Sequence, residues 1–164
     1  MFPSLSNFIE HLDEHLWKSF QRLDHTDIEY IQRIQDENVL LYLVDKVRDF
    51  FSQFNQDGYM ARMGIIKLTY LYYKNDSIYE RIKTRLAAKG KTPPKPNNDL
   101  QGIYLCEDSR NVIGSLVKQI QVSGNPRMKV RAVLYQIYHF ALHNKFAEAK
   151  DLLMKTHMSQ LITN

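Results

Sequence analysis

Two apolar stripes on either side of a short polar break constrain this fold more than any other feature. The first stripe follows Pro126 at intervals of three and four residues, the spacing of one helical face. Its members are Val130, Val133, Leu134, Ile137, Tyr138, Ala141 and Leu142. The second stripe follows Asn144 and Lys145, and its members are Phe146, Ala149, Leu152 and Leu153. Because the break is so short, we expect residues 126–157 to form a helical hairpin, typical of one unit of an α-helical repeat.

Helical spacing also dominates the N-terminal half. A first amphipathic helix is predicted to begin with Ser4 as its N-cap. Thr26 and Glu29 have the spacing of a capping box, so a second helix is predicted to start near Asp27. That helix is apolar over a wide arc, so we expect it at the centre of the bundle. The pattern also leaves open a break in this helix at residues 36–38.

Turn signals divide the rest of this half. Residues 55–58 are predicted to form a turn in which Gly58 takes a positive φ. A third helix is expected over residues 59–74 and a fourth over residues 78–88. The aromatic side chains of residues 70–73 fall at helical spacing, so we interpret them as core rather than as a platform for nucleotides.

A proline-rich connection separates two groups of helices. Residues 89–107 contain three of the five prolines, so we expect a long mobile loop there. Within it, residues 89–98 are expected to be the first place that a protease cuts. Asp108 or Ser109 caps the next predicted helix, and Pro126 suits the first position of the hairpin. The chain is therefore predicted to be one domain over residues 1–164, with helices in 1–88 and 108–164 on either side of the loop.

Composition bounds the class of protein. A chain of 164 residues with 44% hydrophobic and 24% charged residues can bury a core. Its longest apolar run, residues 39–44, is far shorter than a membrane span, and the N-terminus does not resemble a signal peptide. Cys106 is the only cysteine, which fits a reducing compartment. We therefore expect a soluble, cytoplasmic protein that does not act at a membrane.

Positive charge gathers in one segment. Six basic residues occur there with no acidic residue between them: Arg81, Lys83, Arg85, Lys89, Lys91 and Lys95. Such a run can bind the phosphates of RNA. The alternative is a solvated loop, which is favoured because no aromatic residues are interleaved with the charges. Five residues are kept as candidate RNA contacts, namely Lys83, Arg85, Lys89, Lys91 and Lys95.

No motif points to catalysis, a cofactor or a metal. His139 and His143 have the spacing of a zinc helix, but no third ligand or catalytic glutamate accompanies them. Histidines near the end of a helix can instead bond its free carbonyls. His11 and His15 share the spacing and are interpreted as part of a solvated face.

Neighbouring acidic pairs, such as residues 13–14 and 36–37, do not face each other on a helix and are poor candidates for acid–base catalysis. The segment Gly90-Lys91-Thr92 does not have the upstream glycine and strand of a phosphate loop. We expect no enzyme, no cofactor and no small-molecule substrate.

Several segments resemble one family in the same order along the chain. One of them is Tyr138-His139-Phe140-Ala141-Leu142-His143 followed by Ala149-Lys150-Asp151-Leu152-Leu153-Met154. Residues 8–13, 29–37 and 71–74 contribute further matches. Together they are similar to the family of the large c subunit of eukaryotic translation initiation factor 3, whose members carry a PCI domain. Members of that family continue into a PCI module with a winged helix, which lies outside this chain.

The resemblance implies a right-handed array of antiparallel helix hairpins, all-α and similar to TPR or HEAT repeats, without the winged helix. It also implies a non-catalytic scaffold whose partners are other initiation factor 3 subunits and the small ribosomal subunit, including its rRNA. Two alternatives stay open. One is direct RNA binding through the basic segment, and the other is a scaffold of another PCI complex such as the proteasome lid.

Overall fold

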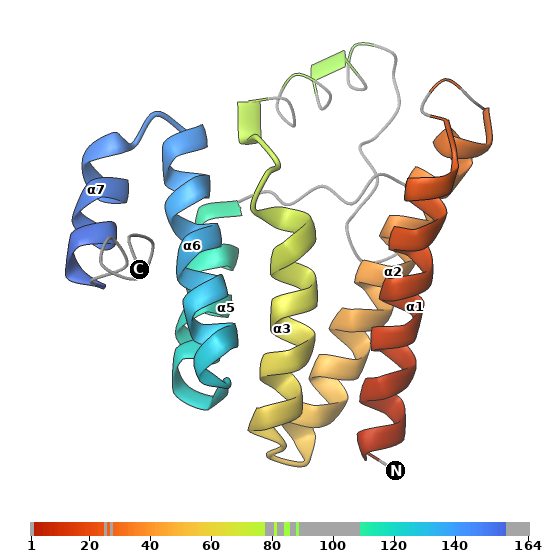
Figure 1. Cartoon of the computed structure of the whole chain (residues 1–164), viewed down its shortest axis with the longest axis horizontal. Coiled ribbons are helices and arrows are strands. Elements are labelled where there is room, and N and C mark those ends of the chain that lie inside the picture. The colour runs from red at the N-terminus through yellow and green to blue at the C-terminus, as the bar shows by residue number, and fades with distance from the viewer. Residues whose placement is uncertain are drawn as a thin grey trace.

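The computed structural model is an all-α protein (Figure 1), and it describes residues 2–24, 26, 28–77, 81, 84–85, 88 and 109–156. Its helices are α1 Phe2–Arg22, α2 Ile28–Gln53, α3 Asp57–Leu71, α5 Ser109–Ser123, α6 Pro126–Leu142 and α7 Phe146–Lys155. Within those described ranges no residue forms a strand. The predicted fold class, an all-α helical array, is confirmed.

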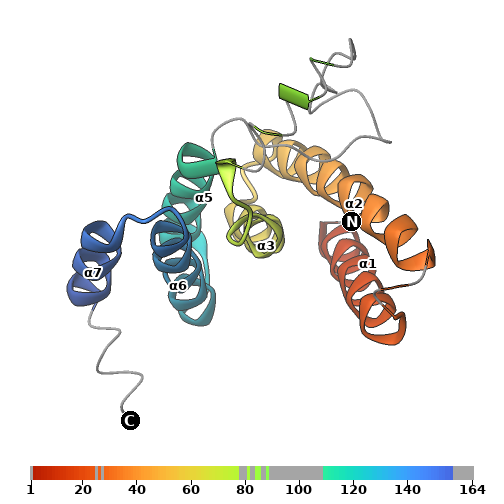
Figure 2. The same ribbon diagram turned by 90° about the horizontal axis from the view of Figure 1, so that it is seen from above.

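The helices follow one another along a curved row, with α1 and α2 at one end and α7 at the other (Figure 2). Helix α3 lies at the centre, because it packs against α2 and α5 and also contacts α1 and α6. Our expectation that the second helix would be central was therefore wrong. The wide apolar arc of α2 is instead shared between α1 and α3. In the described chain, no helix is both long and apolar enough to cross a membrane.

Two apolar clusters meet at α3. The cluster on the side of α1 and α2 includes Ile9, Leu41, Val44, Phe51, Met63 and Tyr70. The cluster on the side of α5 and α6 includes Leu68, Leu71, Ile113, Leu116, Ile120 and Ala132. Because α3 contributes side chains to both clusters, eight of its 15 residues are buried. The two groups of helices on either side of residues 89–107 are thus joined through one shared helix.

One predicted helix boundary needs correction. Helix α1 already begins at Phe2, so Ser4 lies inside the helix rather than at its N-cap. The hydroxyl of Thr26 donates to the carboxylate of Asp24 at 3.0 Å, and the same carboxylate accepts from the Thr26 backbone N–H. Thr26 thus forms a local turn with Asp24, and its capping box with Glu29 stays a prediction. The break that was left open at residues 36–38 does not occur, because α2 runs through them.

The turn between α2 and α3 depends on asparagine rather than glycine. Asn55 has a φ of 52°, in the left-handed region, whereas Gly58 is already within α3. Asparagine tolerates this conformation better than most residues because its short amide can bond locally. Beyond α3, the described residues of the predicted fourth helix, 81, 84, 85 and 88, are helical. The predicted loop 89–107, with Cys106, lies outside the described residues.

The predicted hairpin of α6 and α7 is confirmed, with Pro126 in the first turn of α6 and Asn144 at a φ of 59° in the connection. Its buried face differs from the predicted stripe. Within α6 the buried residues are Ala132, Val133 and His139. Leu134 is 38% exposed, so it is not the core position that the stripe predicted. Helix α6 packs against α5, α7 and α3. It meets α3 through Ala132 and Tyr135, and the Tyr135 ring stacks on that of Tyr72, just after α3, with their centroids 4.3 Å apart.

Candidate functional site

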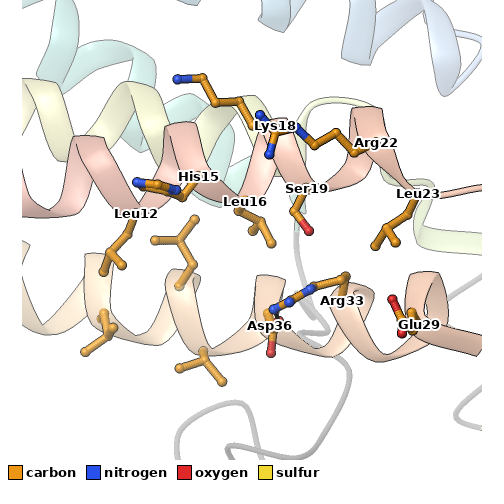
Figure 3. Close-up of a pocket in the computed structure, with 13 residues that line it drawn as sticks. Leu12, His15, Leu16, Lys18, Ser19, Arg22, Leu23, Glu29, Arg33 and Asp36 are labelled. Atoms are coloured by element: carbon orange, nitrogen blue, oxygen red, sulfur yellow. Dashed lines mark hydrogen bonds and ion pairs between the residues drawn. The ribbon is translucent and has the colours of Figure 1, made fainter.

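A groove of about 750 Å³ lies between the second half of α1 and the first half of α2 (Figure 3). Its floor is aliphatic and consists of Leu12, Leu16, Leu23, Val39, Leu40 and Leu43. Leu16 and Leu40 are almost fully buried, whereas Val39 is 37% exposed. The floor therefore changes from closed core to accessible apolar surface within the width of the groove.

The two edges of the groove carry different charges. The α1 edge bears His15, Lys18, Ser19 and Arg22, and the α2 edge bears Glu29, Arg33 and Asp36. Lys18 is 2.6 Å from Glu14, and Arg33 is 3.1 Å from Asp36. Figure 3 shows Leu12, Leu16 and Leu23 directed toward α2, with Lys18 and Arg22 along the outer side of α1. An apolar floor between polar edges is the kind of surface on which a helix of another protein can dock.

The basic segment is only partly described. Arg81 and Arg85 are helical and exposed. Lys83, Lys89, Lys91 and Lys95 lie outside the described residues, so their place relative to Arg85 stays a prediction. No contact among the described residues joins the candidate RNA contacts to the groove.

Buried polar contacts fix the positions of α1, α2 and α3. The ammonium of Lys67 on α3 lies 2.6 and 2.8 Å from the two carboxylate oxygens of Asp45 on α2, and the Lys67 side chain is only 7% exposed. The hydroxyl of Tyr70 donates to Asp13 on α1 at 2.6 Å. Burial raises the pKa of the Asp13 carboxyl. These contacts hold the helices that form the groove at defined separations.

Asp13 and Glu14 illustrate why neighbouring acids on a helix do not act together. The carboxyl of Asp13 points to Tyr70, while the hydrogen bond from Lys18 lowers the pKa of the Glu14 carboxyl at the surface. Their two environments are separate, so the pair does not form the shared pocket that acid–base catalysis requires.

His139 on α6 and His143 just after it form hydrogen bonds to backbone groups. His139 is 2% exposed, with Nδ1 3.2 Å from the carbonyl oxygen of Tyr72 and Nε2 3.0 Å from the hydroxyl of Ser109. Because a carbonyl only accepts, Nδ1 carries the proton and Nε2 accepts from Ser109. Burial lowers the pKa of the His139 imidazole, and the neighbouring His143 lowers it further.

His143 also forms hydrogen bonds to backbone groups. Its Nδ1 donates to the carbonyl of His139 at 2.9 Å, and its Nε2 accepts from the Asp76 backbone N–H at 3.3 Å. The prediction that a histidine here bonds carbonyls of its own helix is correct for His143. No group of three or more His, Cys, Asp or Glu residues suited to a metal occurs in the described part of the chain.

The family is decided by comparison with known proteins. Residues 3–164 match the family model described as the N-terminus of eukaryotic translation initiation factor 3 subunit 8. The chain belongs to this family. The resemblance seen in the sequence is thereby confirmed over nearly the whole chain, including α2 to α7 and all but the first residue of α1.

Relatives in this initiation factor family are distant in sequence but aligned with nearly all of the chain. Three of them are named as the C subunit of eukaryotic translation initiation factor 3. The protein of Schizosaccharomyces pombe is 28% identical over 97% of this chain, that of Drosophila mojavensis 27% over 94%, and that of Dictyostelium discoideum 24% over 94%. The aligned region is 17%, 16% and 15% of these relatives, respectively, so the chain spans about a sixth of their length.

Sequence reasoning missed both the groove and the burial of His139. Within this family member, the signal for His139 was its place seven residues after Ala132, which puts both on one face of α6. Both residues are buried. The signal for the groove was the width of the apolar arc on α2, which extends beyond what two neighbouring helices cover and leaves Val39 exposed.

Proposed function

We propose that this chain is a non-catalytic scaffold region of initiation factor 3, which supports assembly of the factor on the small ribosomal subunit in the cytoplasm. The observation that carries this proposal is the family match over residues 3–164. The relatives are named as subunits of an initiation factor, and the proteasome-lid alternative finds no support among them. We further propose that residues 1–164 act as one helical-repeat domain, because α3 shares its side chains with both apolar clusters.

The described surface suits a scaffold. Large apolar side chains stay exposed on the hairpin, with Phe146 at 63%, Met154 at 60% and Tyr138 at 51%. Exposed apolar surface of this kind is where neighbouring proteins or repeats dock, since their contact removes it from water. On this proposal the partners are other initiation factor 3 subunits, bound through helical faces.

Direct RNA binding is the second candidate, favoured by the six basic residues within 81–95 and by the exposure of Arg81 and Arg85. The two functions are compatible, because a scaffold bound to the ribosome can also touch rRNA. They differ in their response to salt, since contacts to phosphate release counterions and apolar contacts do not.

The test uses the complete protein that contains this chain, with five substitutions to glutamate at Lys83, Arg85, Lys89, Lys91 and Lys95. If all five contact RNA, binding of the unmodified protein to purified small ribosomal subunits falls on the order of 100-fold over a fourfold rise in salt. The substituted protein binds weakly at low salt and shows a much shallower salt dependence. Assembly with other factor subunits, measured by co-purification, is unchanged in both proteins.

Equal ribosome binding by the two proteins at low salt would assign the basic segment to solubility alone. Loss of factor subunits from the substituted protein, with circular dichroism unchanged, would instead contradict assembly through helical faces. Substitution of Lys118, Lys150 and Lys155 by glutamate, at three exposed positions on α5 and α7, provides a control in which positive charge is reversed elsewhere.

A further inference from the structure

We propose that the groove between α1 and α2 binds one amphipathic helix of a partner protein. The apolar face of that helix carries leucine-like anchors. One of its edges is acidic and faces α1, and its other edge carries a basic residue and faces α2. This inference rests on the proposed scaffold function and names the kind of partner that the scaffold holds.

The shape of the groove suits a helix. Its lining extends along both α1 and α2 over several turns, from Leu12 to Leu23 on one side and from Glu29 to Leu43 on the other (Figure 3). A bound helix presents side chains at positions i, i+3, i+4 and i+7 to such a floor. The volume of about 750 Å³ accommodates several of these side chains at once. Val39 is 37% exposed, so a bound helix that covers it removes apolar surface from water.

The charges of the two edges set the direction of the bound helix. On α1 the edge residues His15, Lys18 and Arg22 recur at three and four residues, so they lie along one side of the helix, where Lys18 also pairs with Glu14. On α2 the edge residues are Glu29, Arg33 and Asp36, with one acid on either side of the base, and Arg33 pairs with Asp36. A partner helix with acids toward α1 and a base toward α2 matches both edges, and the same helix laid in the opposite direction loses this match.

A nucleic acid fits this groove poorly. None of the described residues that line it is aromatic, so unstacked bases find no ring there to stack upon. Glu29 and Asp36 on the α2 edge also repel phosphates. The aliphatic floor has instead the chemistry that complements leucine, isoleucine or methionine side chains of a protein partner.

The test uses the 164-residue chain and two designed, fluorescently labelled helical peptides of identical composition. Both carry leucines at i, i+3, i+4 and i+7. The first has glutamates on one edge and lysines on the other, and the second has glutamates and lysines mixed on both edges. Fluorescence anisotropy measures binding of each. We expect the chain to prefer the first peptide, and Lys18→Glu with Arg22→Glu to reduce its affinity about tenfold and shift the preference toward the second.

Val39→Glu places a charge in the apolar floor and is expected to abolish binding of both peptides. Lys118→Glu and Val122→Glu, at exposed positions of α5, are the matched controls and leave binding unchanged. Equal binding of the two peptides, no effect of the α1 substitutions, or binding of a single-stranded RNA oligomer but of neither peptide would overturn the inference. None of these outcomes changes which subunits the complete protein recruits, so the proposed function is tested separately.

Discussion

Replacing Asp45 by alanine is expected to lower the free energy of unfolding by about 3–5 kcal/mol, measured by urea denaturation. The substitution leaves the ammonium of Lys67 in place at 7% exposure while removing the carboxylate 2.6 Å from it. A buried cation whose counter-charge is deleted keeps its desolvation cost and loses the Coulombic attraction that offset it. Because Lys67 belongs to α3, the effect is expected on the whole unfolding transition rather than on a local segment.

A second substitution separates the effect of the unpaired Lys67 charge from the effect of the packing lost with the Asp45 side chain. Adding Lys67→Met to Asp45→Ala removes the buried cation, so most of the lost stability is expected to return. Asp49→Ala, an exposed aspartate one turn further along α2, is the control and changes stability by about 0.5 kcal/mol or less. If the double variant is no more stable than Asp45→Ala alone, the ion pair does not fix α2 against α3 as we infer.

His139 is expected to make the domain less stable as pH drops below about 6.5, the ordinary pKa of histidine. Burial lowers the pKa of His139 in the folded chain, so the unfolded chain binds its proton more readily. Its contribution is therefore fully present above pH ~6.5 and is lost as pH falls through the lowered pKa of the folded state. His143, Asp76 and Lys145 also act on this imidazole, and burial outweighs the opposing effect of Asp76.

The measurement is urea denaturation at several values between about pH 5.5 and 7.5, on either side of the ordinary pKa of histidine. Replacing His139 by asparagine keeps a donor for the Tyr72 carbonyl but loses the acceptor for Ser109, at a cost of about 1–3 kcal/mol. It also removes one titrating group, so the slope of stability against pH flattens by at most about 1.4 kcal/mol per pH unit. His11→Asn, at a side chain 74% exposed, is the control for replacing a histidine at the surface. Parallel slopes for native protein and His139→Asn would contradict this role.

Periodicity predicted the helices well because each helix buries a continuous stripe, and that stripe is visible in the sequence. It failed for Leu134, since a stripe shows which residues share a face but not whether another helix covers that face. The same limit explains why α2 rather than α3 was expected at the centre. Helix α3 is shorter than α2, yet its buried residues face both apolar clusters.

The groove and the hydrogen bonds of His139 depend on contacts between residues far apart in the chain. His139 reaches the carbonyl of Tyr72 and the hydroxyl of Ser109, which lie 67 and 30 positions away. No local pattern encodes such pairings, so a histidine on α6 was equally consistent with a helix end. The family resemblance, by contrast, was carried by local segments, and it could be stated from the sequence alone.

The most direct test of the central proposal is affinity capture of the complete protein from cell extract, with its partners identified by mass spectrometry. If this region belongs to a scaffold of initiation factor 3, the other subunits of that factor are recovered together with small ribosomal subunits. Recovery of a different multi-subunit complex, such as the proteasome lid, or of no initiation factor subunit at all, would contradict the account.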